Sequence, residues 1–204
     1  MKLLIGAGNR GKVRFIKGFL RDLPVTCVGA FELGISLDVA ETGETAEENA
    51  RLKAEAYFHA SRLPTVSSDA GITIEGLAEH EQPGLYVRRV TRDRDASDEE
   101  VLTHFRSLVE NLGGETQAEW TASCALVTRD SSVTTTFSRT TILTSKVCGE
   151  RSPGAPLQSM QLDPKTGQYL AQMSADEHHG FYRRTRGYHE FIEEHLDLIE
   201  RDQT

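Results

Sequence analysis

The first part of the chain alternates short apolar runs with segments of helical periodicity. Residues 3–5 form an apolar run that ends at a glycine, which predicts a buried strand. Residues 11–20 place apolar side chains at helical spacing, and residues 25–28 are β-rich and predict a second strand. Residues 45–61 are dense in Ala, Glu, Leu and Lys, and Thr45 with Glu48 forms a capping-box pattern, so we expect a long helix here.

The later part of the chain continues the alternation and then becomes β-rich. In chain order, the pattern predicts a strand at 64–68, a turn at 69–71, an extended piece at 72–77, a helix at 99–112, two strands at 119–128 and 133–147 that form a hairpin, and a final helix from 185 or 187 to 201. Strands and helices that alternate before a hairpin are typical of one α/β domain with a mixed sheet. We therefore expect residues 1–204 to form a single domain.

Composition and charge narrow the range of partners. The 204 residues are 38% hydrophobic and 26% charged, which is ordinary globular usage. The formal net charge of −8 repels a phosphate polymer, so we expect no nucleic-acid partner. Small anionic ligands remain possible, because a local group of basic residues or a metal ion can outweigh the net charge.

Cysteine usage and hydropathy indicate the cellular compartment in which the protein is expected to reside. Three cysteines without close spacing favour a reducing environment over a disulfide framework. The apolar stretch at the amino terminus is too short for a signal peptide, and no segment approaches the roughly 20 apolar residues of a membrane span. We expect a cytoplasmic protein with no membrane partner.

A glycine-rich turn after the first strand satisfies two phosphate-binding patterns at once. Residues 6–11 match G-x-G-x-x-G, and residues 6–12 match G-x-x-x-x-G-K. Each match has a defect: Val13 stands where a P-loop needs Ser or Thr, and Glu32 lies in a loop-like stretch where a dinucleotide site needs an acid at a strand end. An ordinary strand–turn–helix is a third interpretation. Under both phosphate-binding interpretations, a backbone nest with Asn9 and Lys12 could hold a phosphate.

Carboxylates and a second lysine follow in the middle of the chain. Glu41 precedes the long helix, on which Asn49 and Lys53 lie four residues apart and share a face. Asp69 is expected at the end of a strand, where open α/β sheets place functional groups. Glu41 and Asp69 offer oxygen ligands for Mg²⁺, and Lys12 and Lys53 offer cations for phosphates.

Four segments taken together resemble the inosine triphosphate pyrophosphatase family: GAGNRGK, ETGETAEENARLKA, SSDAGITIEGL and PGLYVRR. The resemblance implies an elongated α/β fold, with a mixed sheet and flanking helices in two lobes around a central cleft, usually as a homodimer. It also implies Mg²⁺-dependent cleavage of a nucleoside triphosphate between its α- and β-phosphates, which gives a monophosphate and pyrophosphate.

The resemblance assigns roles to individual residues. Gly8, Asn9, Lys12 and Lys53 would bind the phosphates, and the two lysines would stabilise the transition state. Glu41 and Asp69 would bind Mg²⁺, and Asp69 would also orient or deprotonate the attacking water. Ser68 stands where the family often has a second acid, and the sequence does not decide whether this weakens metal binding.

The carboxyl-terminal part departs from the family. In place of its Gly-Phe-Gly-Tyr/Trp-Asp-Pro segment, this chain keeps Asp163 but has Met160 where the aromatic would stack on the base. The family's lysine is replaced by His178, and its Ser-His-Arg by Tyr182-Arg183-Arg184, in which only Arg184 is kept.

Four residues of these segments are candidates for substrate binding: the retained Asp163 and Arg184 and the replacements His178 and Arg183. Because buried polar groups select the substrate that pairs with them, their replacement predicts altered or relaxed base specificity. Phe181 or Tyr182 could supply the missing stacking surface, or each could belong to the core.

Other functions remain open at this point. One is a specialised nucleotidase of a modified-nucleotide pathway. Another is a catalytically weak nucleotide-binding or sensing protein, although a pure binder has no need for Asp69. Hydride transfer is supported by the ambiguous glycine turn alone.

Overall fold

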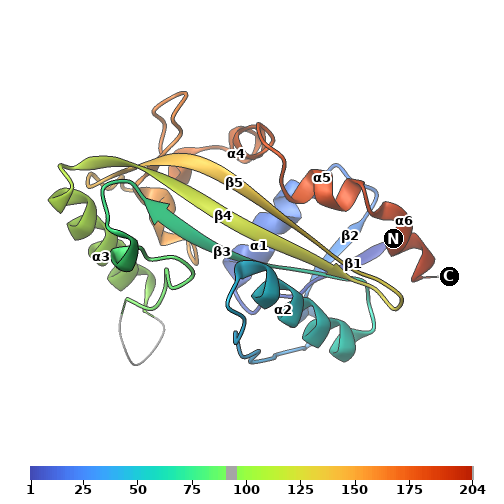
Figure 1. Ribbon diagram of the computed structural model, residues 1–204. Helices are drawn as coiled ribbons and strands as arrows, with labels where there is room; N and C mark the ends of the chain where they lie inside the picture. The colour runs from blue at the N-terminus through green and yellow to red at the C-terminus, as the bar shows by residue number, and fades with distance from the viewer. Residues whose placement is uncertain (91–95, 204) are drawn as a thin grey trace. The chain divides into compact units, whose positions relative to one another are not determined.

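A computed structural model describes residues 1–90 and 96–203, which contain a six-stranded mixed sheet with helices packed against it (Figure 1). The strands are β1 (Lys2–Ile5), β2 (Thr26–Gly29), β3 (Thr65–Ile74), β4 (Glu115–Val127), β5 (Ser132–Thr144) and β6 (Gln161–Leu162). The α-helices are α1 (Arg10–Phe19), α2 (Ala46–Ser61), α3 (Asp98–Asn111), α4 (Ala175–Tyr182), α5 (Tyr188–Glu193) and α6 (Leu196–Arg201). Short 3-10 turns lie at η1 (Ala30–Leu33), η2 (Glu79–Glu81), η3 (Pro156–Ser159) and η4 (Leu170–Gln172).

The sheet has the order β2-β1-β3-β4-β5-β6. β1 pairs in parallel with both β2 and β3, and β5 pairs antiparallel with β6. β4 and β5 are joined by a tight turn in which the Thr128 N–H donates to the Ser131 carbonyl. The α/β mixed sheet and the hairpin that we expected are confirmed.

The described chain separates into two compact units, and β3, β4 and β5 contribute residues to both. The first unit comprises residues 1–70, 122–137 and 182–204, and the second comprises residues 71–121 and 138–181. The expectation of a single domain over 1–204 stays a prediction.

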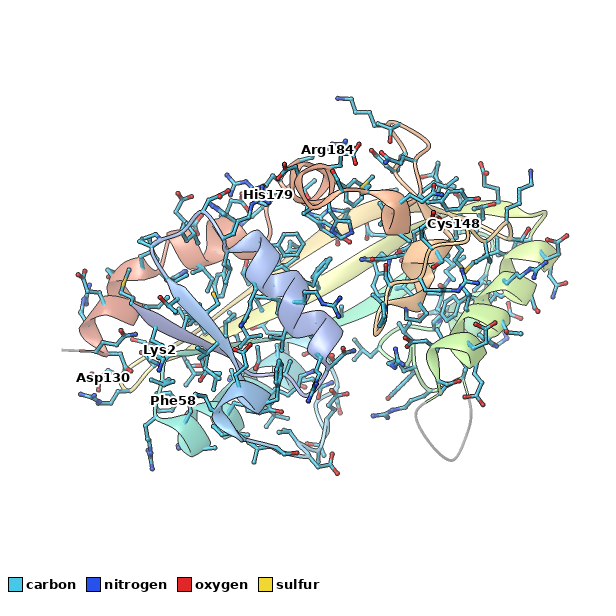
Figure 2. All side chains as sticks on the ribbon, turned by 180° about the vertical axis from the view of Figure 1, so that it is seen from behind. Lys2, Phe58, Asp130, Cys148, His179 and Arg184 are labelled. Atoms are coloured by element: carbon cyan, nitrogen blue, oxygen red, sulfur yellow. The ribbon has the colours of Figure 1, made fainter. Side chains whose placement is uncertain are left out.

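In the first unit, α1 and α2 cover opposite faces of the strands (Figures 1 and 2). Val13 and Ile16 of α1 pack in a cluster with Val66 of β3 and Cys124 of β4. On the other face, Ala50 and Ala54 of α2 pack against Ala125 and Val127. The two helices therefore pack their apolar side chains on opposite faces of the sheet.

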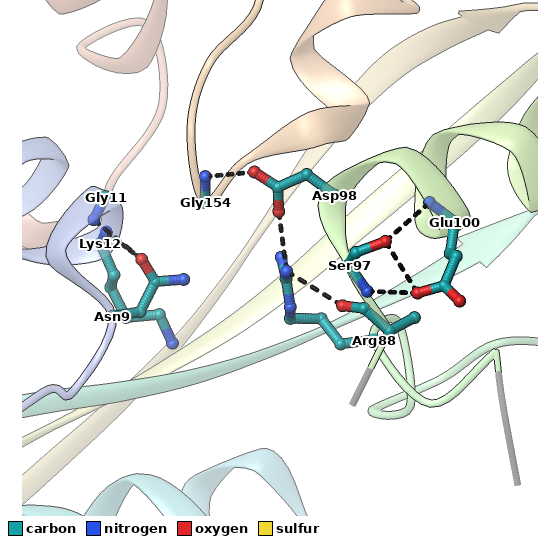
Figure 3. A network of polar contacts seen from close by, with 9 residues as sticks. Asn9, Gly11, Lys12, Arg88, Ser97, Asp98, Glu100 and Gly154 are labelled. Atoms are coloured by element: carbon teal, nitrogen blue, oxygen red, sulfur yellow. Dashed lines mark hydrogen bonds and ion pairs between the residues drawn. The ribbon is translucent and has the colours of Figure 1, made fainter. Parts of the chain in front are cut away.

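In the second unit, α3 packs Val101, Leu102 and Phe105 into a cluster that also contains Met160. Arg88 donates to the Asp98 carboxylate at 2.7 Å, and the same carboxylate accepts from the Gly154 N–H at 2.8 Å (Figure 3). This network joins the start of α3 to the segment before η3.

The predicted turn at residues 69–71 is wrong, because β3 runs without interruption from Thr65 to Ile74. Gly71 is needed for a close approach of two backbones rather than for a turn. A Cβ on Gly71 would lie 2.8 Å from the Gly84 carbonyl oxygen, beside the antiparallel bridge between Ile72 and Gly84. Asp69 thus lies inside a strand, not at its end.

The predicted final helix is divided into α5 and α6, with a break at His195. The Nδ1 of His195 donates to the Phe191 carbonyl at 2.8 Å, and the backbone N–H of His195 donates to Ile192 instead. Helix α4 and strand β6 were not predicted. None of the helices in the described ranges is both long and apolar enough to cross a bilayer.

Candidate active site

The glycine-rich turn positions the start of α1. Asn9 is the N-cap, and its Oδ1 accepts hydrogen bonds from the backbone N–H groups of Gly11 and Lys12 (Figure 3). These two amides are therefore already engaged and do not form the open backbone nest that we expected. Gly6 is needed for packing, since a Cβ there would lie 2.9 Å from the Tyr57 ring, whereas Gly8 is exposed with room for a side chain.

Lys12 extends from α1 to β3, where its Nζ donates to the Ser68 carbonyl at 3.2 Å. No carboxylate pairs with this ammonium within the described ranges. Burial, reinforced by the charge of Lys53, lowers the pKa of Lys12 below its usual value of 10.5, and Asp69 and Glu41 offset this only in part. A partly buried cation without an ion-pair partner is suited to bind an anion.

We expect Lys12→Met to raise the melting temperature, because methionine fills similar space without the cost of a desolvated charge. Since the folded-state pKa of Lys12 lies below its unfolded value, the unfolded state binds more protons between the two values, and wild-type stability rises with pH there. The increase in melting temperature of Lys12→Met over wild type should thus be largest at neutral pH and shrink as the pH approaches 10.5. Calorimetry of the variant beside the exposed-site control Lys17→Met checks this, and a lower melting temperature than wild type would contradict it.

Lys53 of α2 contacts two carboxylates, those of Glu41 and Asp69. Its Nζ lies 2.9 Å from Glu41 Oε1 and 2.9 Å from Asp69 Oδ1. The Lys53 and Asp69 side chains are 11% and 12% exposed, whereas that of Glu41 is 37% exposed. The structure thus brings together three predicted residues from α2, β3 and the loop before α2.

The two carboxylates fit a divalent metal ion. They already share one cation, the Lys53 ammonium, at equal distances. Within residues 1–90 and 96–203, no group of three or more His, Cys, Asp or Glu side chains could form a metal site. Two carboxylates can hold a divalent ion together with other oxygen ligands, such as phosphates and water.

Ser68 does not share the face of Asp69. Successive side chains of a strand point to opposite faces, and Val66 and Ala70 pack in the cluster of α1. The Ser68 side chain therefore lies on the α1 face, with its hydroxyl buried and without a hydrogen-bond partner among the residues that the structure describes. An acid at position 68 would not lie beside Glu41 and Asp69, so the serine takes no carboxylate away from that pair.

Asn49 is a site residue that the sequence analysis did not select. Its Nδ2 donates to Asp69 Oδ2 at 3.3 Å, and its side chain is buried. The sequence signal for Asn49 was its spacing of four residues from Lys53 on one helix, which places both side chains on the same face. In the structure both side chains contact the Asp69 carboxylate.

Comparison with known proteins shows the family to which the chain belongs. The sequence profile of the Ham1 family matches residues 3–194. The chain belongs to the Ham1 family. This confirms the resemblance inferred from the four segments.

Curated relatives match over part of their length. A dITP/XTP pyrophosphatase of Yersinia pseudotuberculosis is 35% identical over 114 residues, 56% of each chain. One of Leptospira interrogans is 28% identical over 136 residues, 67% of this chain and 66% of that protein.

Solved structures share the fold over a larger part of the chain. The Staphylococcus aureus Ham1 protein has a TM-score of 0.62 at 26% identity and covers 86% of this chain and 88% of its own. A HAM1 protein from Coxiella burnetii has a TM-score of 0.67 at 21% identity, covering 90% and 96%.

The candidates of this Ham1-family chain in the second unit are Asp163 and His178. Asp163 is buried, and its carboxylate accepts from the Lys165 N–H at 3.0 Å and from the Thr166 hydroxyl at 2.8 Å, so it organises a turn. Burial, with a contribution from Arg139, lowers the pKa of His178 to about 4. At neutral pH His178 is therefore uncharged and does not replace the charge of the family's lysine.

Arg183 and Arg184, which follow α4, lie in the first unit. Arg183 pairs with Glu190 at 3.1 Å, and Arg184 is exposed (Figure 2). Tyr182 packs edge-on against Phe15 at 4.7 Å and so belongs to an aromatic cluster with α1. Phe181, in the second unit, is buried. Their sequence-based roles in substrate binding stay predictions.

Proposed function

We propose that this Ham1-family protein hydrolyses nucleoside triphosphates to the monophosphate and pyrophosphate. The observation that carries the proposal is the group formed by Lys12, Lys53, Glu41 and Asp69 in one unit, with cations for phosphates beside carboxylates for a metal ion and a proton. The names of the curated relatives, dITP/XTP pyrophosphatases, support the same reaction.

Each side chain has a defined part in this reaction. Lys12 and Lys53 bind the phosphate oxygens and stabilise the charge that develops in the transition state. Asp69 accepts a proton from the water that attacks phosphorus, while the α–β bridging bond breaks and pyrophosphate leaves. Although Lys53 and Asn49 occupy one site on each Asp69 oxygen, a carboxylate has about four lone-pair positions, so a site for this proton remains.

Glu41 and Asp69 would hold the divalent ion, which we propose is Mg²⁺. When bound, such an ion neutralises phosphate charge and lowers the pKa of water. Lys53 would keep its carboxylate partners and direct its third N–H to a phosphate oxygen, because an ammonium has three donors.

We also propose that the base preference is altered or relaxed. Met160, at the position of the stacking aromatic, has no exposed surface and packs in the apolar cluster of the second unit. His178 is uncharged at neutral pH. Neither residue supplies the stacking ring or the positive charge that the resemblance implies for selection of inosine and xanthosine.

The test is a pyrophosphate-release assay with Mg²⁺ across standard, deaminated and modified nucleoside triphosphates. We expect pyrophosphate and no orthophosphate, with kcat/KM for the inosine and xanthosine substrates within about tenfold of the best other substrate. Inosine and xanthosine triphosphates far ahead of all others would contradict altered specificity. Nucleotide-induced thermal stabilisation without turnover would instead support a binding protein.

Two further expectations come from the sequence, the first implied by the resemblance and the second indicated by cysteine usage and hydropathy. These are a homodimer, which light scattering would check, and a cytoplasmic location, which fractionation of the native host would check.

A further inference from the structure

Asn49 connects the strand that carries Asp69 with the loop that carries Glu41. The residue is 3% exposed. Its Nδ2 donates to Asp69 Oδ2 at 3.3 Å, and its Oδ1 accepts from the Gly43 N–H at 2.8 Å. The amide orientation follows from these partners, because a carboxylate needs a donor and a backbone N–H needs an acceptor.

Asn49 and Lys53 together hold both oxygens of Asp69. Lys53 Nζ contacts Oδ1 at 2.9 Å, and Asn49 contacts Oδ2. The two residues are one turn apart on α2, so a single rigid helix face determines how the carboxylate is rotated.

The loop that carries Glu41 packs closely against Asn49. A Cβ on Gly43 would lie 2.8 Å from Asn49 Oδ1 and 2.6 Å from the Glu48 Cβ, so the loop backbone packs directly on the first turn of α2. Glu41, two residues before Gly43, then reaches Lys53. Asn49 therefore contacts both segments that supply carboxylates to the site.

We propose that Asn49 is a positioning residue that fixes the rotation of the Asp69 carboxylate for proton transfer. The inference rests on the proposed hydrolysis and deepens it. A carboxylate without its second hydrogen bond rotates more freely, and small errors in the placement of a reacting group reduce the rate of the chemical step.

Two variants separate this role from a purely structural one. Asn49→Asp keeps an oxygen that can accept from Gly43 but loses the donor to Asp69, whereas Asn49→Ala loses both contacts. Asn111→Asp, the same change at the exposed end of α3, is the matched control.

We expect both Asn49 variants to lower kcat by about 10- to 100-fold, with KM for the nucleotide within about threefold of wild type. A kcat of Asn49→Asp close to that of wild type would overturn the proposal, because it would show that the hydrogen bond from Asn49 to Asp69 does not contribute to the rate.

A second measurement does not depend on turnover. In a crystal structure of Asn49→Ala, we expect the Asp69 carboxylate to rotate away from its contact with Lys53, and an unchanged carboxylate would overturn the positioning role. If wild type and Asn111→Asp both lack activity, the proposed function fails, and the crystal structure still decides whether Asn49 orients Asp69.

Discussion

Replacing Asp69 with asparagine is expected to lower kcat for pyrophosphate release by about a thousandfold, within the range that loss of a general base produces. Asparagine has nearly the same volume, so the buried position inside β3 remains filled. Its amide, however, does not accept the proton from water and contributes no negative charge to a metal ion. The change removes chemistry rather than packing.

The measurement is kcat and KM at saturating Mg²⁺, with Asp130→Asn as the control. Asp130 is exposed in the turn between β4 and β5, so the same substitution there should leave both constants unchanged (Figure 2). Because Asp69→Asn takes one carboxylate from the buried Lys53, we expect its melting temperature to fall, so activity is measured well below that temperature. A kcat above about one tenth of wild type would show that another group accepts the proton.

Lys53→Met should abolish activity and, without divalent metal, lower the free energy of unfolding by about 2 to 3 kcal/mol. The variant leaves the carboxylates of Asp69 and Glu41 facing each other without the ammonium between them. The cost stays below that of a fully buried ion pair because Glu41 is 37% exposed and partly screened by solvent.

Divalent metal should restore much of this stability, because an ion bound to the folded state alone stabilises it by mass action. Denaturant unfolding with and without Mg²⁺ measures the effect. Lys17→Met, which breaks the surface pair with Glu32, should lower the free energy of unfolding far less than Lys53→Met and show no metal dependence. Equal stability of Lys53→Met in both conditions would contradict a metal site at these carboxylates.

The two lysines are thus expected to affect stability in opposite directions. Lys53 has two carboxylate partners, so its removal leaves negative charge uncompensated. Lys12 donates to a carbonyl, and burial penalises its charge. A site that keeps such a cation sacrifices stability for anion binding.

Local sequence determined most of the secondary structure. The long helix begins where Thr45 and Glu48 form their capping box, because capping depends on neighbouring residues alone. The hairpin of β4 and β5 likewise follows from two β-rich runs around a short polar segment. The motifs in the first part of the chain were specific enough to indicate the family and the charged residues of the site.

Three-dimensional packing decided where those residues point. Asp69 lies inside β3 because the strand continues beyond it, and Gly71, which suggested a turn, allows the approach of Gly84. Strand alternation then separates Ser68 from Asp69, although they are adjacent in sequence. The role of Asn49 depends on the distance between a helix and a strand, which helical periodicity does not specify.

Burial also changed the properties expected of residues that the sequence analysis had selected. His178 is a potential cation in the sequence, but its environment lowers its pKa to about 4. Met160 and Asp163 occupy positions expected in base recognition, yet one packs in an apolar cluster and the other organises a turn. The sequence by itself determined the residue types of the site and the local elements that carry them. The tertiary structure decided their burial, charge state and partners, because these depend on atoms contributed by segments far apart in the chain.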